Sequence, residues 1–231
     1  MVIFRIELFV SRLLDHFLSG VNSLMTVAVK LLDNQSNCSD CVSLYLNKFL
    51  KVVTFSEREL DLIRERLISK TFKKNEYIVA AGEVSNHMHF IVSGLVRVFH
   101  LDHNKEVNTD FYWNNAFLTA YESFVTRKPS KEYLQCLEDT HLISIEYDAY
   151  PYLNKHTDSW ETLCRLFIEQ RLLDMIKKAS LLQTNNAKDK YLNFVDKTPA
   201  KVIAKIPNYQ IASYLGITAE SLSRVRQKIN Q

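Results

Sequence analysis

Hydrogen-bonding side chains near the C-terminus recur at a spacing that places them on one face of a helix: Glu220, Ser223, Arg224 and Gln227. At 100° per residue, the apolar residues of the same stretch fall on the opposite side. Arg224 can donate two hydrogen bonds to guanine O6 and N7, Glu220 can accept one from a cytosine amino group, and Ser223 can bond a base edge or a phosphate. The pattern predicts a helix that packs through Leu222, Val225 and Ile229 and offers its other side to duplex DNA.

The residues before this helix complete a helix-turn-helix. We expect a first helix over 208–215, with Asn208 capping its free amide groups. Gly216 supplies the tight turn, and Thr218 is a good cap for the second helix. The residues expected to position phosphates are Thr218, Ser221, Tyr209, Gln210 and the surrounding lysines. The alternative is an ordinary helical hairpin whose outer face is only solvated.

Residues 211–218 (Ile-Ala-Ser-Tyr-Leu-Gly-Ile-Thr) and 220–224 (Glu-Ser-Leu-Ser-Arg) resemble the C-terminal domain of the Crp/Fnr superfamily of bacterial transcription regulators. Residues 90–98 are similar to the first hairpins of that family's cyclic-nucleotide-binding-like barrel. Residues 121–124 and 128–130 are similar to a variant found outside the cyclic-AMP-responsive members. The resemblance covers about residues 45 to 230 and implies an α+β chain. Its parts are an N-terminal β jelly-roll barrel, a long dimerisation helix and a C-terminal winged helix-turn-helix.

The resemblance also implies how the chain is divided. Residues 1–44 are an N-terminal extension, 45–156 the sensor barrel, 157–183 the dimerisation helix and 184–231 the DNA-binding domain. It implies a cytoplasmic homodimer that binds double-stranded DNA, with RNA polymerase as a candidate partner and an unidentified small molecule as effector. The alternative function is a dimeric small-ligand-binding module with a C-terminal domain that does not bind DNA.

The middle of the chain shows the pattern of short strands separated by turns. Strands are expected at 72–79, 87–92, 95–101, 107–112, 133–138 and 142–146. This spacing favours a small barrel or jelly roll. A helix capped by Ser56 and running through Ile68 is expected before them.

A longer helix is expected from Thr157 to about Leu182. Its incomplete apolar stripe contains Trp160, Leu163, Phe167, Leu173 and Ile176. Periodicity alone leaves two interpretations open, packing on its own barrel or pairing with a second copy. The resemblance favours pairing, with Leu163 and Phe167 at the two-fold seam.

The sequence argues against a cyclic nucleotide as the effector. In the cyclic-AMP-binding relatives a glutamate binds the ribose hydroxyl and an arginine pairs with the phosphate. The corresponding positions here are Ala120 and Ser130, although Glu122 and Arg127 lie close by. The family cavity can still accept another ligand, and the residues expected to form its wall are Tyr121, Glu122 and Ser123.

Enzyme and metal chemistry are weakly supported. His87-x-His89 on a strand resembles the metal-binding pair of cupins, but no carboxylate follows within residues 90–94. No nucleophile elbow or phosphate-binding glycine loop occurs, and the chain has only four glycines. We therefore expect no enzyme activity, no metal and no cofactor.

Four cysteines leave one alternative open, because some members of the resembled family hold an iron–sulfur cluster near their N-terminus. A cluster needs four thiolates or substitutes, whereas the N-terminal group here has only Cys38 and Cys41. Cys136 and Cys164 fall in an expected strand and the expected long helix. Buried free thiols are the simpler interpretation.

Charge is distributed unevenly along the 231 residues, whose formal net charge is +3. From residue 184 onward, eight Lys and Arg face three acidic residues, which places the positive field on the part expected to meet phosphate. No segment has the 18 or more uninterrupted apolar residues of a membrane helix. Residues 1–32 are interrupted by charges, so we expect an amphipathic helix or an appended segment there rather than a signal peptide.

Overall fold

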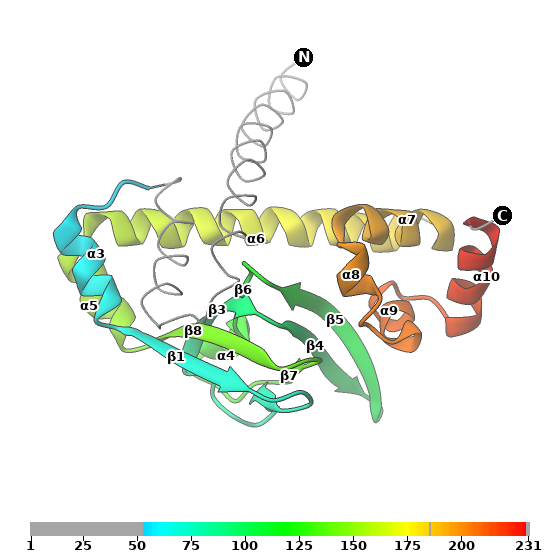
Figure 1. The fold of residues 1–231 in the computed structure, drawn as a ribbon, viewed down its shortest axis with the longest axis horizontal. Helices are drawn as coiled ribbons and strands as arrows, with labels where there is room; N and C mark the ends of the chain where they lie inside the picture. The colour runs from blue at the N-terminus through cyan, green and yellow to red at the C-terminus, as the bar shows by residue number, and fades with distance from the viewer. Residues whose placement is uncertain (1–52, 185, 230–231) are drawn as a thin grey trace, which may run out of the picture. The chain divides into compact units, whose positions relative to one another are not determined.

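Strands make up most of residues 67–146 and form two four-stranded sheets in which all pairs are antiparallel (Figure 1). One sheet has the order β1-β8-β3-β6 and the other has the order β2-β7-β4-β5. The strands are β1 (Leu67–Phe72), β2 (Tyr77–Val79), β3 (His87–Ser93), β4 (Leu95–Asp102), β5 (Lys105–Trp113), β6 (Phe117–Leu118), β7 (Glu132–Cys136) and β8 (Thr140–Glu146). This interleaved order is that of a jelly roll, which confirms the predicted barrel.

The computed structural model describes residues 53–184 and 186–229. Contacts divide the chain into residues 1–44 and 45–231, and every described residue belongs to the second unit. The helices of this unit are α3 (Glu57–Arg64), α4 (Tyr121–Thr126), α5 (Ala149–His156), α6 (Asp158–Thr184), α7 (Ala187–Lys197), α8 (Ala200–Ile203), α9 (Asn208–Tyr214) and α10 (Ala219–Ile229). The finer division at residues 156 and 183 stays a prediction.

The barrel core lies between the two sheets. Ile91 and Leu142 come from one sheet, Val98 and Leu134 from the other, and all four are buried in one cluster. The turn between β3 and β4 needs glycine for two reasons. Gly94 has φ +133°, and a Cβ atom there would collide with the side chain of Thr140.

The first described helix ends earlier than the sequence indicated. Ser56 begins α3 with a capping box, in which its hydroxyl accepts from the Glu59 amide and the Glu59 carboxylate accepts from the Ser56 amide. The helix ends at Arg64 instead of Ile68, because residues 67–72 pair with β8. Strand pairing therefore overrides the helical pattern of these residues.

The long helix α6 begins next to a helix that the sequence did not reveal. Thr157 donates its hydroxyl to the Leu153 carbonyl of α5 at 2.6 Å, instead of capping α6 as expected. Farther along, Arg171 bonds Asp110 of β5 at 3.4 Å, and Lys178 donates to the Thr109 carbonyl. These contacts fix which side of α6 faces the barrel.

The C-terminal helices share a hydrophobic core with the barrel. One buried cluster joins Leu95 of β4 and Phe111 of β5 to Phe194 of α7, Ile211 of α9 and Leu222 of α10. Described residues 186–229 contain α7, α8, α9 and α10 and no strand, so the strands of the expected wing do not occur in this range. The helix-turn-helix thus rests on a sheet of the barrel.

Candidate nucleic-acid interface

The turn between α9 and α10 has the glycine and the helix cap that the sequence predicted. Gly216 adopts φ +61°, and the Ile217 amide donates to the Ala212 carbonyl at 3.0 Å. Thr218 caps α10, since its hydroxyl accepts from the Ser221 amide at 3.2 Å. Ala212 of α9 is buried.

The cap expected for α9 is wrong. Pro207 occupies the N-cap position, and Asn208 is already the first residue of the helix. Because Asn208 lies inside the helix and not at the N-cap position, its side chain does not cap the free amides of the first turn. The side chain is therefore available for another contact. Its amide oxygen accepts a hydrogen bond from Arg226 of α10, which ties the two helices together.

Helix α10 has one packed side and one open side. Leu222 is buried and Val225 is half-buried, whereas Glu220, Ser223 and Arg224 are exposed. Ile229, expected on the packed side, is instead 39% exposed, because the helix extends beyond the core that covers Leu222. The polar face that sequence periodicity indicated is therefore open to solvent over its full length.

Local hydrogen bonds involve two side chains of this open face, Glu220 and Arg224. The pKa of Glu220 is lowered by a hydrogen bond from its own backbone amide, by one from the Thr218 hydroxyl and by the charge of Arg224. Glu220 is thus an ionised acceptor at neutral pH. Arg224 contacts the Ser221 hydroxyl at 3.4 Å, a weak contact that leaves its guanidinium accessible.

The residues expected to position phosphates are not equally accessible. Thr218 and Tyr209 are exposed, and Ser221 is half-buried. Gln210 is only 3% exposed, with its amide donating to the Tyr209 hydroxyl at 3.2 Å. A direct phosphate contact by Gln210 is incompatible with that position.

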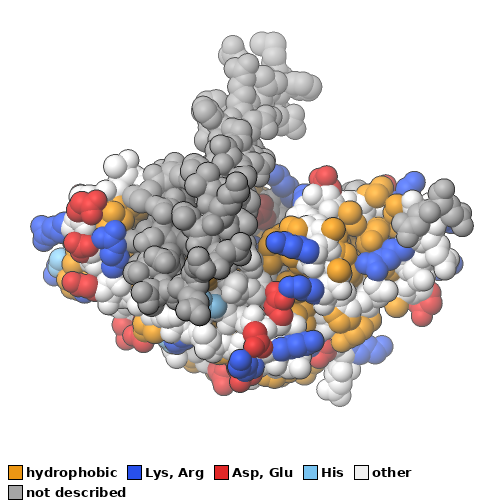
Figure 2. Space-filling view, viewed as in Figure 1, with side chains coloured by type: hydrophobic (Ala, Val, Ile, Leu, Met, Phe, Trp, Pro, Cys, Tyr) orange, Lys and Arg blue, Asp and Glu red, His pale blue; other side chains and the backbone are white. Residues whose placement is uncertain are grey.

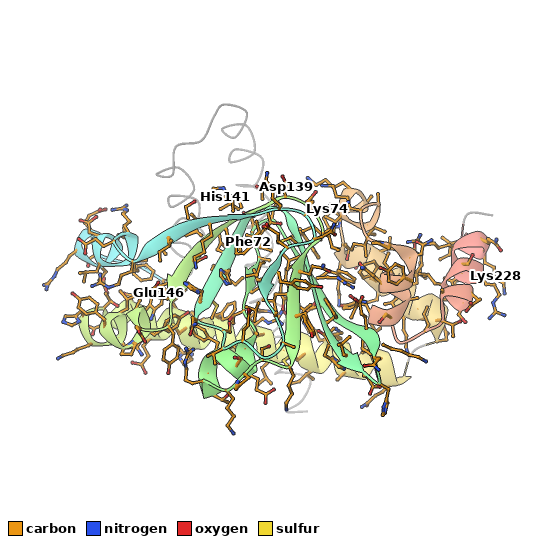
Figure 3. The ribbon with its side chains drawn as sticks, turned by 90° about the horizontal axis from the view of Figure 1, so that it is seen from below. Phe72, Lys74, Asp139, His141, Glu146 and Lys228 are labelled. Carbon is orange, nitrogen blue, oxygen red and sulfur yellow. The ribbon has the colours of Figure 1, made fainter. Side chains whose placement is uncertain are left out.

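Several basic side chains of the C-terminal helices are exposed, and others are already paired. Lys205 forms an ion pair with Glu138 of the barrel, and Arg226 bonds Asn208. Lys188, Lys201 and Lys228 are exposed, and Figure 3 shows Lys228 directed away from the other helices. The exposed lysines supply the positive charge that phosphate binding requires.

The first half of α6 contacts its own barrel, which corrects the expected seam. Leu163 is 6% exposed, and the ring of Phe167 lies edge-on to that of Phe117 of β6, 5.5 Å away. The exposed apolar residues come later, at Ile168, Leu172, Leu173, Met175 and Ile176. Figure 2 shows hydrophobic side chains interspersed with Lys and Arg over the visible part of α6 and α7.

The residues expected to form a ligand wall lie on α4. Tyr121 and Glu122 are exposed, while Ser123 is buried with both hydrogen-bonding functions in use. The Ser123 hydroxyl accepts from the Ser85 amide at 2.9 Å and donates to the Lys128 carbonyl at 2.6 Å. Ser123 therefore anchors the loop before β3.

Neither metal ligation nor membrane insertion has support in the part of the chain that the structure describes. No group of three or more metal-ligating side chains occurs in residues 53–184 and 186–229. No helix within these ranges is long and apolar enough to cross a bilayer. Cys136 and Cys164 are free thiols, and burial raises their pKa values to about 11 and about 12. Cys38 and Cys41 lie outside the described residues.

Residues 69–153 match the family of cyclic nucleotide-binding domains. No curated protein is significantly similar to the chain in sequence. Among solved structures, FixK2 from Bradyrhizobium japonicum is similar over 71% of this chain and 84% of its own, with 16% identity and a TM-score of 0.62. The c-di-GMP-responsive global regulator CLP from Xanthomonas campestris is similar over 76% of this chain and 92% of its own, with 15% identity and a TM-score of 0.61.

A third similar structure is assigned to the Crp/Fnr family of transcriptional regulators and comes from Eubacterium rectale. It covers 76% of this chain and 84% of its own, with 17% identity and a TM-score of 0.60. The chain therefore has the fold of these regulators, as its sequence resemblance implied.

Proposed function

We propose that this chain, which has the fold of the Crp/Fnr regulators, binds specific duplex DNA sequences as a homodimer and regulates transcription. The observation that carries the proposal is the open face of α10, where Glu220, Ser223 and Arg224 project opposite the buried Leu222. A helix with accessible Arg and Glu on one side has the chemistry for reading base edges in the major groove.

The test is a selection of bound sequences from a random duplex library, run on wild type and Arg224→Ala at one salt concentration. Arg224→Ala should weaken binding by about 1–3 kcal/mol per half-site and relax selectivity at one base pair. The matched control is Lys201→Ala, an exposed cation off the reading face. Lys201→Ala should weaken binding to all sequences alike and reduce the salt slope by about one unit.

Equal sequence preferences in wild type and Arg224→Ala would remove Arg224 from the reading role. Absence of salt-dependent duplex binding by the wild type would instead favour the alternative of a ligand-binding module.

The proposed dimer uses the second half of α6. Apolar side chains follow one another at spacings of four and three residues, at Ile168, Leu172, Met175, Ala179 and Leu182. This heptad-like spacing forms a seam on one side of a helix. Leu172 is 55% and Met175 is 62% exposed, so a second copy of α6 has an apolar surface to cover. Two-fold pairing also matches two DNA half-sites.

Replacing both Leu172 and Met175 with glutamate should yield monomers, because like charges would face each other across the seam. Lys177→Glu is the matched control, since it changes the net charge by the same amount on the opposite side of α6. Sedimentation distinguishes the outcomes. A monomeric wild type at micromolar concentration, or a dimeric double variant, would contradict this arrangement.

The effector is proposed not to be a cyclic nucleotide. Ala120 offers no polar group, and the Ser130 hydroxyl is bonded within its own loop to the Glu132 backbone. Arg127, the nearby substitute, donates to the Ser85 and Phe124 carbonyls instead. Millimolar cyclic AMP should leave the melting temperature unchanged, whereas a ligand present at 100 times its Kd stabilises by about 2.7 kcal/mol.

A further inference from the structure

A cavity of about 480 Å³ opens at one end of the barrel. It is lined by Lys70, Phe72, Ile78, Val79, Glu83, Val84, Asn86, His87 and His89. Its base contains the buried His89 and Val79, and its rim contains the exposed Glu83 and Asn86. The volume falls in the range of ordinary small-molecule sites. Neither Ala120 nor Ser130 lines it, and Ser130 borders it through a hydrogen bond from its amide to the Glu83 carbonyl.

Side chains on the inner face of this sheet change from apolar to polar where the sheet borders the cavity. Ile91 of β3 pairs with Leu142 of β8, and both are fully buried in the apolar core. Two and four residues earlier on the same face of β3 come His89 and His87, beside Ser144 and Glu146 of β8. Figure 3 labels Phe72 and Glu146, which lie on the neighbouring strands β1 and β8. Polar side chains thus replace the core residues at this end.

The polar groups of the cavity are held in fixed positions. The Nζ of Lys70 lies 2.8 Å from the Nε2 of His87, and the Nδ1 of His89 lies 2.7 Å from the Ser144 hydroxyl. The two imidazole rings are stacked with their centroids 5.7 Å apart. Because an ammonium only donates, His87 accepts from Lys70 and is neutral in this arrangement.

Burial reinforces that protonation state. It lowers the pKa of His89 to about 3, with smaller contributions from His87 and Lys70. Burial also lowers the pKa of His87, assisted by the charge of Lys70 and opposed by Glu146. At neutral pH the cavity therefore contains one ammonium beside two neutral imidazoles. Titratable groups with strongly perturbed pKa values cluster at functional sites.

The charge balance limits the ligand to a single negative charge. Lys70 uses one of its three donors on His87, which leaves donors for an anion. Two carboxylates oppose further negative charge. Glu146 has an oxygen 3.7 Å from His87 Nε2, and Glu83, whose carboxylate accepts from the Ala80 amide, lies on the rim. The two carboxylates would repel a phosphate dianion, whereas one ammonium balances the single negative charge of a carboxylate ligand.

We propose that this cavity binds a small carboxylic acid as its monoanion, with the carboxylate at the Lys70 ammonium and the apolar body against Phe72, Ile78, Val79 and Val84. The apolar side chains of the lining match a short hydrocarbon chain, because burying it there removes apolar surface from water. This binding goes beyond the proposed function and does not depend on DNA binding by α10.

The probe is hexanoate, titrated into the full-length protein and followed by calorimetry and by the imidazole resonances of His87 and His89. Hexanoate should bind and shift both sets of resonances. Hexanamide, which has the same shape without the charge, should bind at least about tenfold more weakly, because a hydrogen bond to a charged group is lost. Inorganic phosphate should leave the resonances unchanged.

Two variants test the site from different sides. Lys70→Gln removes the ammonium, and Val84→Phe fills the cavity from a half-buried loop position; each should weaken hexanoate binding at least about tenfold. Lys73→Gln is the matched control, because Lys73 is an exposed lysine that pairs with Asp139 outside the cavity. Its affinity for hexanoate should equal that of the wild type.

Several outcomes would overturn the proposal. These are no binding of hexanoate by the wild type, equal binding of hexanamide, and a stronger Lys70-dependent response to phosphate. Unchanged affinity in both Lys70→Gln and Val84→Phe would also overturn it, since binding would then occur elsewhere. Sequence selection by α10 is measured separately, so failure here leaves the DNA-binding proposal standing.

Discussion

Helices α9 and α10 are joined by residues 215–218, yet their environments differ. Helix α9 buries Gln210, Ile211 and Ala212 and bonds to strand β5, whereas Leu222 is the buried residue of α10. The first helix is thus held by the barrel over most of its length, whereas the second buries one side chain and is tied to α9 by the turn and by the Arg226–Asn208 hydrogen bond. A helix that presents polar groups to a ligand can bury only a narrow strip, so its orientation depends on the neighbour that carries it.

Strand β5 is what holds α9 in place. Tyr214 lies between Phe111 of β5 and Phe194 of α7, with both ring centroids 5.5 Å away. The Asn108 amide of β5 donates to the Ser213 hydroxyl at 2.9 Å, and that hydroxyl contacts the Glu106 carbonyl at 3.3 Å. Any movement of β5 therefore acts directly on the helix that carries α10.

The largest effect is expected from Ile211→Ala on α9. Ile211 is fully buried in the cluster shared by the barrel and the C-terminal helices. Truncating it should lower the free energy of unfolding by about 2–5 kcal/mol, through lost apolar burial and the cavity left behind. Urea unfolding measures this. A loss below about 0.5 kcal/mol, the size of an ordinary surface effect, would mean that α9 is not packed on β5 in solution.

A smaller effect is expected from Ser213→Ala. The substitution removes the acceptor of the buried Asn108 amide and should cost about 1–3 kcal/mol. Hydrogen exchange at the Asn108 amide should become faster. Ser223→Ala on α10 is the control, because Ser223 is exposed and its loss should change the free energy of unfolding by less than about 0.5 kcal/mol. Equal effects of the two substitutions would remove the distinction between the helices.

The features that the sequence predicted well are local. The cap at Thr218, the left-handed Gly216 and the strand pattern around 87–101 depend on residues close together in the chain, and all of them occur in the structure. Backbone sterics and capping act within a few residues, so their patterns are visible in one sequence. The exposed polar side of α10 follows from the same local periodicity.

The features that the sequence missed depend on distant partners. Asn108 and Ser213 are far apart in the chain, and no local pattern indicates that β5 and α9 bond. Strand pairing with β8 likewise decided that residues 67–72 leave the helix begun at Glu57. For α6, the apolar stripe contained both the residues that face the barrel and those that face outward, and only the contacts of Phe167 and Arg171 separate the two sets.

The smallest effect is expected at Ile229, which also gives the sharpest test of the difference between α9 and α10. Its spacing from Leu222 and Val225 placed it on the packed side of α10, but it is 39% exposed, beyond the shared core. Ile229→Ala should therefore change the free energy of unfolding by no more than about 0.5 kcal/mol, against several kcal/mol for the same substitution at Ile211. Because both variants remove the same atoms, their difference in urea unfolding measures burial alone. A loss at Ile229 as large as that at Ile211 would mean that the end of α10 is as deeply covered as α9, and the second helix would no longer bury Leu222 alone.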